Sequence, residues 1–250
     1  LMKKKILLIG FNKQKINLIQ KKVKNCIFLN ATNINKFKDI SFEAIITYNR
    51  RNFEKLYYSK NFNHFLEKIK WIHIGVSGIE KYANLKKFLK KKITITTANK
   101  LHLNQIADHA IGLLLSVTRN LHFVSKYGFK KKFEYLPKSL SDKKLMIIGY
   151  GNIGKQIAKR AYGFGMKINA VTLNSKPKKN RIIENFLSYR SYQSYLKFMD
   201  IIIFSLPLNL KSSEMYNFKT AKKYKKGVIL INISRGEIVS ENVIYKNLKN

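Results

Sequence analysis

One stretch near the middle of the chain, residues 143–172, constrains the fold more than any other. It begins with an apolar run typical of a buried parallel strand and continues into three glycines, Gly149, Gly151 and Gly154, spaced G-x-G-x-x-G. Apolar residues then recur at helical spacing, and a second apolar run follows at 168–171. The sequence therefore predicts a strand, a glycine turn, a helix and a second strand in one short unit.

Each glycine of this unit has a separate physical task. The first permits a tight turn, the second lets a pyrophosphate approach the backbone, and the third lets the helix pack closely on the strand. The free N–H groups at the start of the helix then face the phosphates. Because the glycines stand between a strand and a helix, the pattern predicts a dinucleotide-binding turn. The alternative is a tight turn that binds nothing.

The charge of the chain is unusual, with 50 Lys and Arg against 13 Asp and Glu and a formal net charge of +37. Such a balance raises the possibility of a nucleic acid or an anionic membrane as a partner. The lysines, however, are spread over the whole length and form no basic stripe with interleaved aromatic residues. We therefore expect weak, salt-sensitive attraction to polyanions but no specific nucleic-acid binding.

The sequence carries no sign of export or of a membrane anchor. The apolar run at 6–11 is too short for a secretory signal, and no apolar run is long enough to span a bilayer. A single cysteine, Cys26, cannot form an internal disulfide, and we interpret it as a small apolar residue of a buried strand. These features predict a cytoplasmic protein without a membrane partner.

Strands and helices alternate along the first hundred residues. Strands are expected at 3–10, 26–29, 43–48, 71–74 and 93–97, and helices at 14–24 and 53–70. This alternation predicts a parallel sheet that is covered on both faces. Gly10 lacks the further glycines of the fingerprint, so this half is not expected to hold a pyrophosphate.

Residues 101–126 form the longest helical pattern, and we expect them to make one helix that connects two domains. Its expected apolar stripe consists of Ile106, Ala110, Leu113, Leu114, Val117, Leu121 and Val124. The predicted domains are 1–100 and 101–250. His102, His109 and His122 lie on or near this helix, but their spacing does not gather metal ligands, so structural roles are favoured and no metal site is predicted.

The remainder of the second domain continues the alternation. A basic loop is expected at 176–181, helices at 191–199 and 218–224, strands at 200–205 and 228–233, and a last helix that begins at Ser240.

Several separated stretches resemble the D-isomer-specific 2-hydroxyacid dehydrogenases, in the same order and over essentially the whole chain. The matching stretches are Trp71-Ile72, Ser77-Gly78-Ile79-Glu80, Ile106-Ala107-Asp108-His109-Ala110, Gly149-Tyr150-Gly151-Asn152-Ile153-Gly154, Ser205-Leu206-Pro207-Leu208 and Ile231-Asn232-Ile233-Ser234-Arg235-Gly236. The resemblance implies two similar doubly wound α/β domains, a Rossmann-type cofactor domain and a flavodoxin-like substrate domain. It also implies an active site in the cleft between them, and C-terminal strands of the family fold that this chain lacks.

By the same resemblance, the glycine turn belongs to an NAD(P) site. Asn152 and Ile153 are expected to lie against the pyrophosphate. Leu206, together with Ile233 and Ser234, is expected to flank the nicotinamide and its ribose.

The resemblance also assigns substrate-binding and catalytic residues. Ser77 and Gly78 are expected to offer backbone N–H groups to a substrate carboxylate, and Arg235 is the expected catalytic arginine beside the nicotinamide. A planar guanidinium can bind a carboxylate and polarise a 2-oxo group together. The alternative for Arg235 is a solvated arginine of a loop.

The chain departs from the resembled pattern after the second strand of the glycine unit. The acidic residue that would bind the ribose 2′-hydroxyl is absent, and Thr172 stands in its place. Asn174, Ser175 and Lys176 follow and could hydrogen-bond a 2′-phosphate. This favours NADP modestly over NAD, the alternative being a relaxed site without preference.

A second departure concerns the proton-transfer groups. In the resembled family a catalytic Glu and then a catalytic His come well after the arginine, whereas Glu237 and Glu241 are too close to Arg235 to match and no histidine follows it. Loss of a general acid–base costs about 10²–10⁴-fold in rate. We therefore expect this polypeptide to be a weak or inactive catalyst.

The function expected from the resemblance is hydride transfer between NAD(P)H and a small 2-oxo or 2-hydroxy acid with D stereochemistry, by a homodimer built through the cofactor domain. Two alternatives from other classes stay open. One is a non-catalytic nucleotide-binding remnant, and the other is a polyanion-binding protein, which predicts a steep salt dependence and no nicotinamide nucleotide binding.

Overall fold

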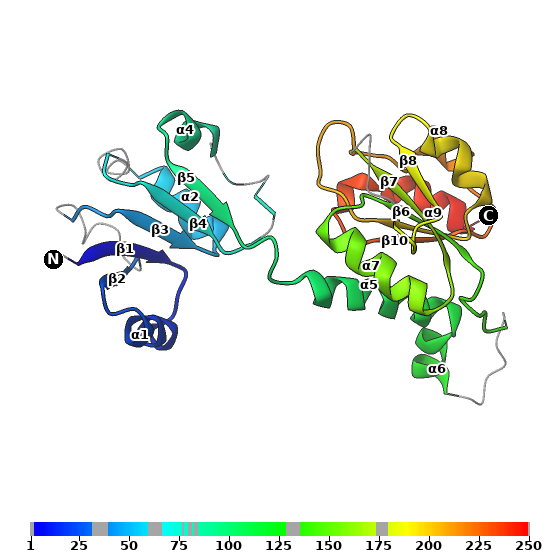
Figure 1. Ribbon diagram of the computed structural model, residues 1–250, viewed down its shortest axis with the longest axis horizontal. Coiled ribbons are helices and arrows are strands. Elements are labelled where there is room, and N and C mark those ends of the chain that lie inside the picture. Colours follow the sequence, from blue (N-terminus) through cyan, green and yellow to red (C-terminus); the bar gives the residue numbers. More distant parts are fainter. Residues whose placement is uncertain are drawn as a thin grey trace. The chain divides into compact units, whose positions relative to one another are not determined.

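A computed structural model of the chain describes residues 3–31, 40–59, 67–76, 78–79, 82, 85–128, 136–173 and 180–249. The chain divides into two compact units, unit 1 (Leu1–Leu101) and unit 2 (His102–Asn250). Each unit contains a sheet of five strands flanked by helices (Figure 1). The fold class expected from the sequence, two α/β units built on parallel sheets, is thereby confirmed.

The sheet of unit 1 has the strand order β2-β1-β3-β4-β5, and all of its neighbouring strands are parallel. The elements are β1 (Lys4–Ile9), α1 (Lys13–Lys22), β2 (Cys26–Asn30), β3 (Ala44–Thr47), α2 (Arg50–Tyr57), β4 (Trp71–Ile74), α4 (Leu85–Lys90) and β5 (Thr94–Thr97). This order is that of a flavodoxin-like doubly wound sheet.

Strand β1 of unit 1 is buried on both faces because its side chains alternate between two apolar clusters. Leu7 and Ile9 belong to the cluster that includes Phe53 of α2, whereas Ile6 and Leu8 belong to the cluster on the other face. A strand covered on both sides needs apolar residues at consecutive positions, which explains its unbroken apolar run.

The helix expected at 53–70 is shorter and begins earlier. Asn49 caps α2 with its side-chain oxygen, which accepts a hydrogen bond from the N–H of Asn52 at 3.1 Å. The helix ends at Tyr57. The expectation for 60–66 lies outside the described residues. The N-cap was missed because Asn49 precedes the first apolar residue of the helical pattern, Phe53, by four positions.

The sheet of unit 2 has the strand order β10-β9-β6-β7-β8 and is also parallel. The elements are α5 (Leu103–Thr118), α6 (Leu121–Tyr127), β6 (Lys144–Ile148), α7 (Asn152–Gly163), β7 (Lys167–Thr172), β8 (Asn185–Ser188), the 3₁₀ helix η2 (Tyr192–Phe198), β9 (Ile201–Phe204), α8 (Phe218–Ala221), β10 (Ile229–Asn232), the 3₁₀ helix η3 (Gly236–Ile238) and α9 (Glu241–Lys249). In chain order the strands read 3-2-1-4-5, which is the Rossmann order.

Two apolar clusters cover the faces of this sheet. Leu145 and Ile147 of β6 pack with α5 and α7, whereas Met146 and Ile148 pack with residues of η2, η3 and α9. Ala158 and Ala161 of α7 belong to the same apolar cluster as residues of α5, the helix against which α7 packs. The sheet of unit 2 is therefore enclosed on both faces, as a parallel sheet requires.

The single helix expected at 101–126 is two helices. α5 ends at Thr118, and Asn120 adopts the left-handed conformation (φ 56°) before α6 begins. The buried face of α5 is set by Ala107, Ala110, Ile111 and Leu114, so α5 is part of the core of unit 2 rather than a free connector.

The expected apolar stripe was also too wide. Leu113, Val117 and Leu121 are 40%, 47% and 53% exposed. Successive residues are rotated by about 100° around a helix, and the sheet covers only part of the helix circumference. These three residues therefore lie next to the buried face and not on it.

The structure adds a strand that the sequence did not indicate. β8 follows residues 174–179 and pairs with β7, and within it only Leu187 is buried. A short strand with one buried residue at the edge of a sheet has too weak an apolar pattern to be recognised. The helix expected at 191–199 is the 3₁₀ helix η2.

Asp200, at the start of β9, links the beginnings of three strands of unit 2. Its carboxylate accepts a hydrogen bond from the N–H of Lys144 at 2.9 Å and another from the ammonium group of Lys225, and its backbone carbonyl accepts from Ile229 at 3.0 Å. Burial raises the pKa of this carboxyl, but the hydrogen bonds and the positive charges of Lys225 and Lys143 outweigh burial, so the pKa of Asp200 is lowered.

We expect Asp200→Asn to lower the free energy of unfolding of the chain at neutral pH, by about 1–2 kcal/mol, because charge-assisted hydrogen bonds are lost. A carboxyl whose pKa is lowered by folding contributes its stability above the unfolded-state pKa of about 4, and that contribution is lost as the pH falls through the folded-state pKa. Urea unfolding of both chains between pH 7 and pH 2 should show a difference that shrinks toward acid. A difference that is constant with pH would contradict the assignment.

Candidate functional site

The expected cofactor residues of unit 2 lie along one edge of its sheet, where the strands end. The glycine turn follows β6, Thr172 ends β7, Leu206 follows β9, and the loop 233–235 follows β10. These four strands are neighbours in the order β10-β9-β6-β7. From β6 the chain adds β7 and β8 on one side and then adds β9 and β10 on the other side. The strand order therefore reverses between β6 and β9, which is the topological switch point of the sheet. Ligands of open α/β sheets bind at such a point.

Two of the three glycines are required by packing. Gly149 has φ +105°, and a Cβ at this position would collide with the carbonyl group of Ser205. A Cβ at Gly154 would collide with the carbonyl oxygen of Gly149. The turn is also held to β7, since the N–H groups of Gly149 and Tyr150 both donate to the carbonyl of Val171 at 3.1 Å.

The middle glycine has a different environment. A Cβ on Gly151 would have no heavy atom within 4 Å, so the turn leaves open space above this residue. Gly151 is the N-cap of α7, which has no side-chain cap and no acidic residue in its first turn. Open space over a glycine beside uncapped N–H groups suits a pyrophosphate, and the residues present therefore fit a dinucleotide.

The loop after β10 is held by side-chain hydrogen bonds. The hydroxyl of Ser234 accepts from the N–H of Leu206 at 3.0 Å and so joins the loops after β10 and β9. Asn232 accepts from the N–H of Ser234 at 3.1 Å and donates to the carbonyl of Arg235 at 2.7 Å. The guanidinium of Arg235 donates to the carbonyl of Ser234 at 2.8 Å. The backbone that carries the expected catalytic arginine is thus fixed at both sides.

Asn232 was not recognised as a site residue from the sequence. Its role depends on two hydrogen bonds to the following loop, which only the folded backbone shows. An asparagine at the last position of a strand, directly before an arginine-bearing loop, is the signal that could have indicated it.

Two further side chains beside the glycine turn were not singled out as site residues. Tyr150 packs edge-on against Phe186 of β8, with ring centroids 5.3 Å apart. Burial raises the pKa of Tyr150, and a hydrogen bond from Asn180 only partly offsets this. The hydroxyl of Ser205 is buried next to Gly149 and has no hydrogen-bond partner among the described residues.

Several expected site residues cannot be placed. Ser77, Asn174, Ser175 and Lys176 lie outside the described residues. Gly78 is described, and it follows the end of β4 by four residues. The predicted substrate-carboxylate contact and the predicted preference for NADP therefore stay predictions.

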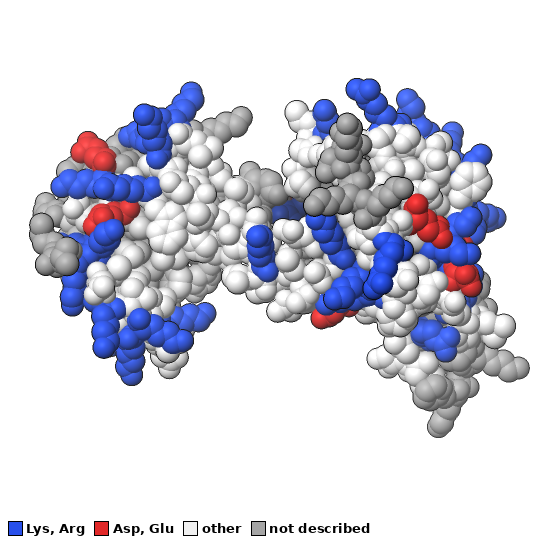
Figure 2. Space-filling view, viewed as in Figure 1, with Lys and Arg blue, Asp and Glu red and all other residues white. Residues whose placement is uncertain are grey.

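The described residues contain no group of three or more His, Cys, Asp or Glu side chains that could hold a metal ion. The ring of His122 is hydrogen-bonded to the carbonyl of Ser116 at 3.0 Å. In the described part of the chain, no helix is long and apolar enough to cross a membrane. Figure 2 shows Lys and Arg side chains over the visible face of each unit, with few Asp and Glu among them.

Comparison with known proteins identifies similar sequences. Residues 111–250 match the sequence model of the family described as "D-isomer specific 2-hydroxyacid dehydrogenase, NAD binding domain". A glyoxylate reductase of Thermococcus litoralis is 35% identical over 170 residues, which cover 64% of this chain and 51% of that protein. A hydroxypyruvate reductase of Thermotoga maritima is 31% identical over 178 residues, 70% of this chain and 55% of that protein. The chain thus spans about half the length of the curated relatives it matches.

Solved structures share the fold at lower sequence identity. A D-lactate dehydrogenase of Aquifex aeolicus, solved with NAD and lactic acid, has a TM-score of 0.75 at 22% identity over 98% of this chain and 73% of that chain. A D-isomer-specific 2-hydroxyacid dehydrogenase family protein of Aeromonas salmonicida has a TM-score of 0.81 at 18% identity over 100% of this chain and 78% of that chain. These likenesses show the shared fold, and the match to an NAD-binding domain confirms the expected cofactor class, NAD(P).

The geometry of the glycine turn predicts that substitution by alanine has different effects on stability at Gly154 and at Gly151. We expect Gly154→Ala to lower the free energy of unfolding by about 1–3 kcal/mol, because its Cβ meets the backbone of Gly149. Gly151→Ala should change it by less than about 0.5 kcal/mol, since its Cβ meets nothing and its φ of −85° suits any residue. Urea unfolding measures both. Equal losses in the two variants would show that the turn is packed differently.

Proposed function

This chain belongs to the D-isomer-specific 2-hydroxyacid dehydrogenase family, and from this premise we propose that it transfers hydride between NAD(P)H and a small 2-oxo or 2-hydroxy acid of D configuration. The observation that carries the proposal is the open space over Gly151 at the switch point of the unit 2 sheet. The backbone of Gly151 lies at the start of α7. The loop that carries Arg235 follows β10, which is two strands away from β6 in the same sheet.

The proposed cofactor site uses backbone groups more than charged side chains. Gly151, Asn152 and Ile153 hold the pyrophosphate with N–H groups of the first turn of α7. Leu206 and Ile233 flank the nicotinamide, which supplies or accepts the hydride. The hydrogen bond from the N–H of Leu206 to the hydroxyl of Ser234 joins the loops after β9 and β10, which supports placing both loops beside one ligand.

Arg235 is the proposed catalytic residue. Its guanidinium can bind the carboxylate of a 2-oxo acid and polarise the carbonyl that receives the hydride. Ser77 and Gly78 are proposed to hold the same carboxylate with backbone N–H groups. Glyoxylate and hydroxypyruvate, named for the relatives above, are compact 2-oxo acids of the expected class.

A homodimer through unit 2 is proposed with the function. The exposed apolar residues Leu113, Val117 and Leu121, on α5 and at the start of α6, support such a contact, because a second copy would remove them from water. The cytoplasmic location inferred from the sequence also stays a prediction.

Titration calorimetry with NADPH and NADH tests the cofactor site. We expect both to bind, NADPH more tightly, because no carboxylate stands at Thr172 to repel a 2′-phosphate. Gly151→Val should weaken binding at least about tenfold, since its side chain fills the space of the pyrophosphate. Gly163→Val, at the other end of α7 and equally uncrowded, is the matched control. Tighter binding of NADH would reverse the preference, and unchanged binding by Gly151→Val would reject the site.

Steady-state assays with glyoxylate, hydroxypyruvate and pyruvate test the activity. No histidine follows Arg235 in these 250 residues, so we expect this polypeptide to turn over about 10²–10⁴-fold below an ordinary kcat of about 10 s⁻¹. Arg235→Gln should abolish the remainder. Turnover at the ordinary rate would show that another group transfers the proton. Binding of NADPH with no turnover at all favours a non-catalytic nucleotide-binding protein, and salt-sensitive DNA binding without NADPH binding favours a polyanion-binding one.

A further inference from the structure

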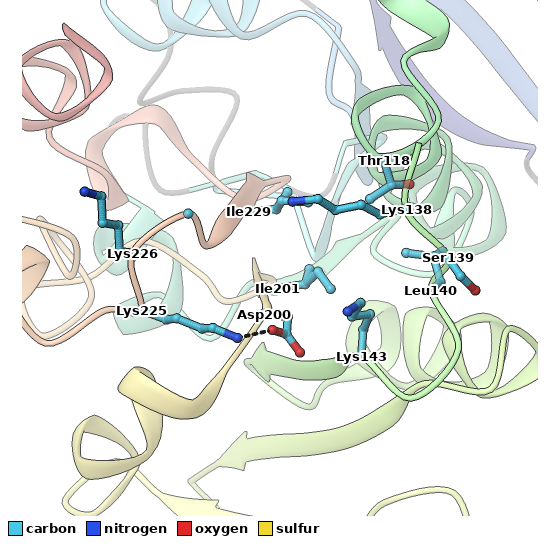
Figure 3. Close-up of a pocket in the computed structure, with 11 residues that line it drawn as sticks. Thr118, Lys138, Ser139, Leu140, Lys143, Asp200, Ile201, Lys225, Lys226 and Ile229 are labelled. Atoms are coloured by element: carbon cyan, nitrogen blue, oxygen red, sulfur yellow. Dashed lines mark hydrogen bonds and ion pairs between the residues drawn. The ribbon is translucent and has the colours of Figure 1, made fainter. Parts of the chain in front are cut away.

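A pocket of about 250 Å³ lies at the opposite edge of the unit 2 sheet, where the strands begin (Figure 3). It is bounded by the end of α5, by residues 138–143 before β6, by the start of β9, and by the turn 225–227 before β10. The five residues of β6 separate this edge from the glycine turn by about 16 Å, at about 3.3 Å per residue. The pocket is therefore distinct from the proposed cofactor site.

Lysines are over-represented in the lining of this pocket. The lining residues are Thr118, Lys138, Ser139, Leu140, Lys143, Asp200, Ile201, Lys225, Lys226, Gly227 and Ile229. With 50 lysines and arginines in 250 residues, about two would be expected among eleven, and four are present. Lys138, Lys143 and Lys225 approach from three sides, whereas Lys226 points outward (Figure 3).

The one carboxylate of the lining does not neutralise these lysines. Asp200 already accepts hydrogen bonds from Lys225 and from the backbone N–H of Lys144. No ion pair to a carboxylate in the described part of the chain involves Lys138, Lys143 or Lys226. The lining therefore holds an excess of positive charge that a bound anion would balance.

The pocket wall is apolar behind the ammonium groups. Leu140 and Ile201 are 4% and 2% exposed, and Ile229 is half-buried. Lys143 is half-buried beside this wall, where its charge is screened less than in open water, whereas Lys138, Lys225 and Lys226 are exposed. Lysine is a compact point charge and suits phosphate without demanding one fixed geometry.

We propose that this pocket binds a compact anion with two linked phosphoryl groups, either inorganic pyrophosphate or the diphosphate end of a small molecule. Its volume corresponds to on the order of eight water molecules, which admits such a group but not a whole dinucleotide. Binding neutralises the lysines around Asp200, where three strands begin, and stabilises unit 2 by mass action.

The experiment is a calorimetric and thermal-unfolding titration of the full chain with inorganic pyrophosphate, inorganic phosphate and adenosine diphosphate at fixed ionic strength. The pocket variant is Lys138→Gln with Lys143→Gln. The control, Lys159→Gln with Lys219→Gln, removes the same charge from exposed residues of unit 2 that do not line the pocket. Gly151→Val removes the glycine turn as a competing site.

We expect pyrophosphate to bind more tightly than phosphate and to raise the unfolding temperature. The pocket variant should weaken pyrophosphate binding about tenfold or more, whereas the control and Gly151→Val should change it less than about twofold. Adenosine diphosphate binding as tightly as pyrophosphate would identify a diphosphate end as the ligand, and weaker binding would identify the free anion. Equal losses in pocket variant and control would show non-specific attraction and overturn the proposal.

A second measurement avoids substitutions. Acetylation of the unaltered chain, followed by mass spectrometry, reports the accessibility of each lysine. Pyrophosphate should protect Lys138 and Lys143 but not Lys159 or Lys219. Two outcomes would place the anion elsewhere and overturn the proposal: no protection of these lysines at concentrations that saturate the calorimetric signal, or loss of binding only in Gly151→Val. Neither outcome would affect the proposed enzymatic function.

Discussion

The close approach of backbone to backbone at the end of β6 is the constraint on which the rest of unit 2 depends. Gly149 lies against the carbonyl of Ser205 and Gly154 against the carbonyl of Gly149, so only hydrogen side chains permit α7 to start directly over the strand. This contact places the first turn of α7 at the switch point of the sheet. The space above Gly151, between these two crowded glycines, is open.

Charge has two different roles in this molecule. Most of the described basic residues are exposed, where water and salt screen them and where they contribute little to stability. Two acidic residues of unit 2 have partners on other elements. Asp108 of α5 pairs with Arg160 of α7 at 2.6 Å, across the helix pair that covers one face of the sheet. Asp200 joins the starts of β6, β9 and β10, and the lysines around it exceed what one carboxylate can balance.

The two edges of the unit 2 sheet therefore present different anion-binding chemistry. The edge where strands end uses uncapped backbone N–H groups and a fixed arginine loop, which can recognise the shape of a ligand. The edge where strands begin uses lysine side chains around a small apolar-walled pocket, which recognises charge density. The first arrangement is visible as a sequence motif, whereas the second brings together segments that lie more than 100 residues apart.

The sequence alone determined the α/β class, the glycine turn and the family resemblance. These rest on local periodicity and on the glycine spacing, in which Gly149 and Gly154 have no room for a side chain. It did not reveal the break of the long helix at Asn120, the edge strand β8, or the loop-holding role of Asn232. These features, and the lysine pocket, were decided only by the tertiary structure. A left-handed residue, an edge pairing and a side-chain bond to a later loop depend on what the folded chain brings alongside, which a local pattern does not encode.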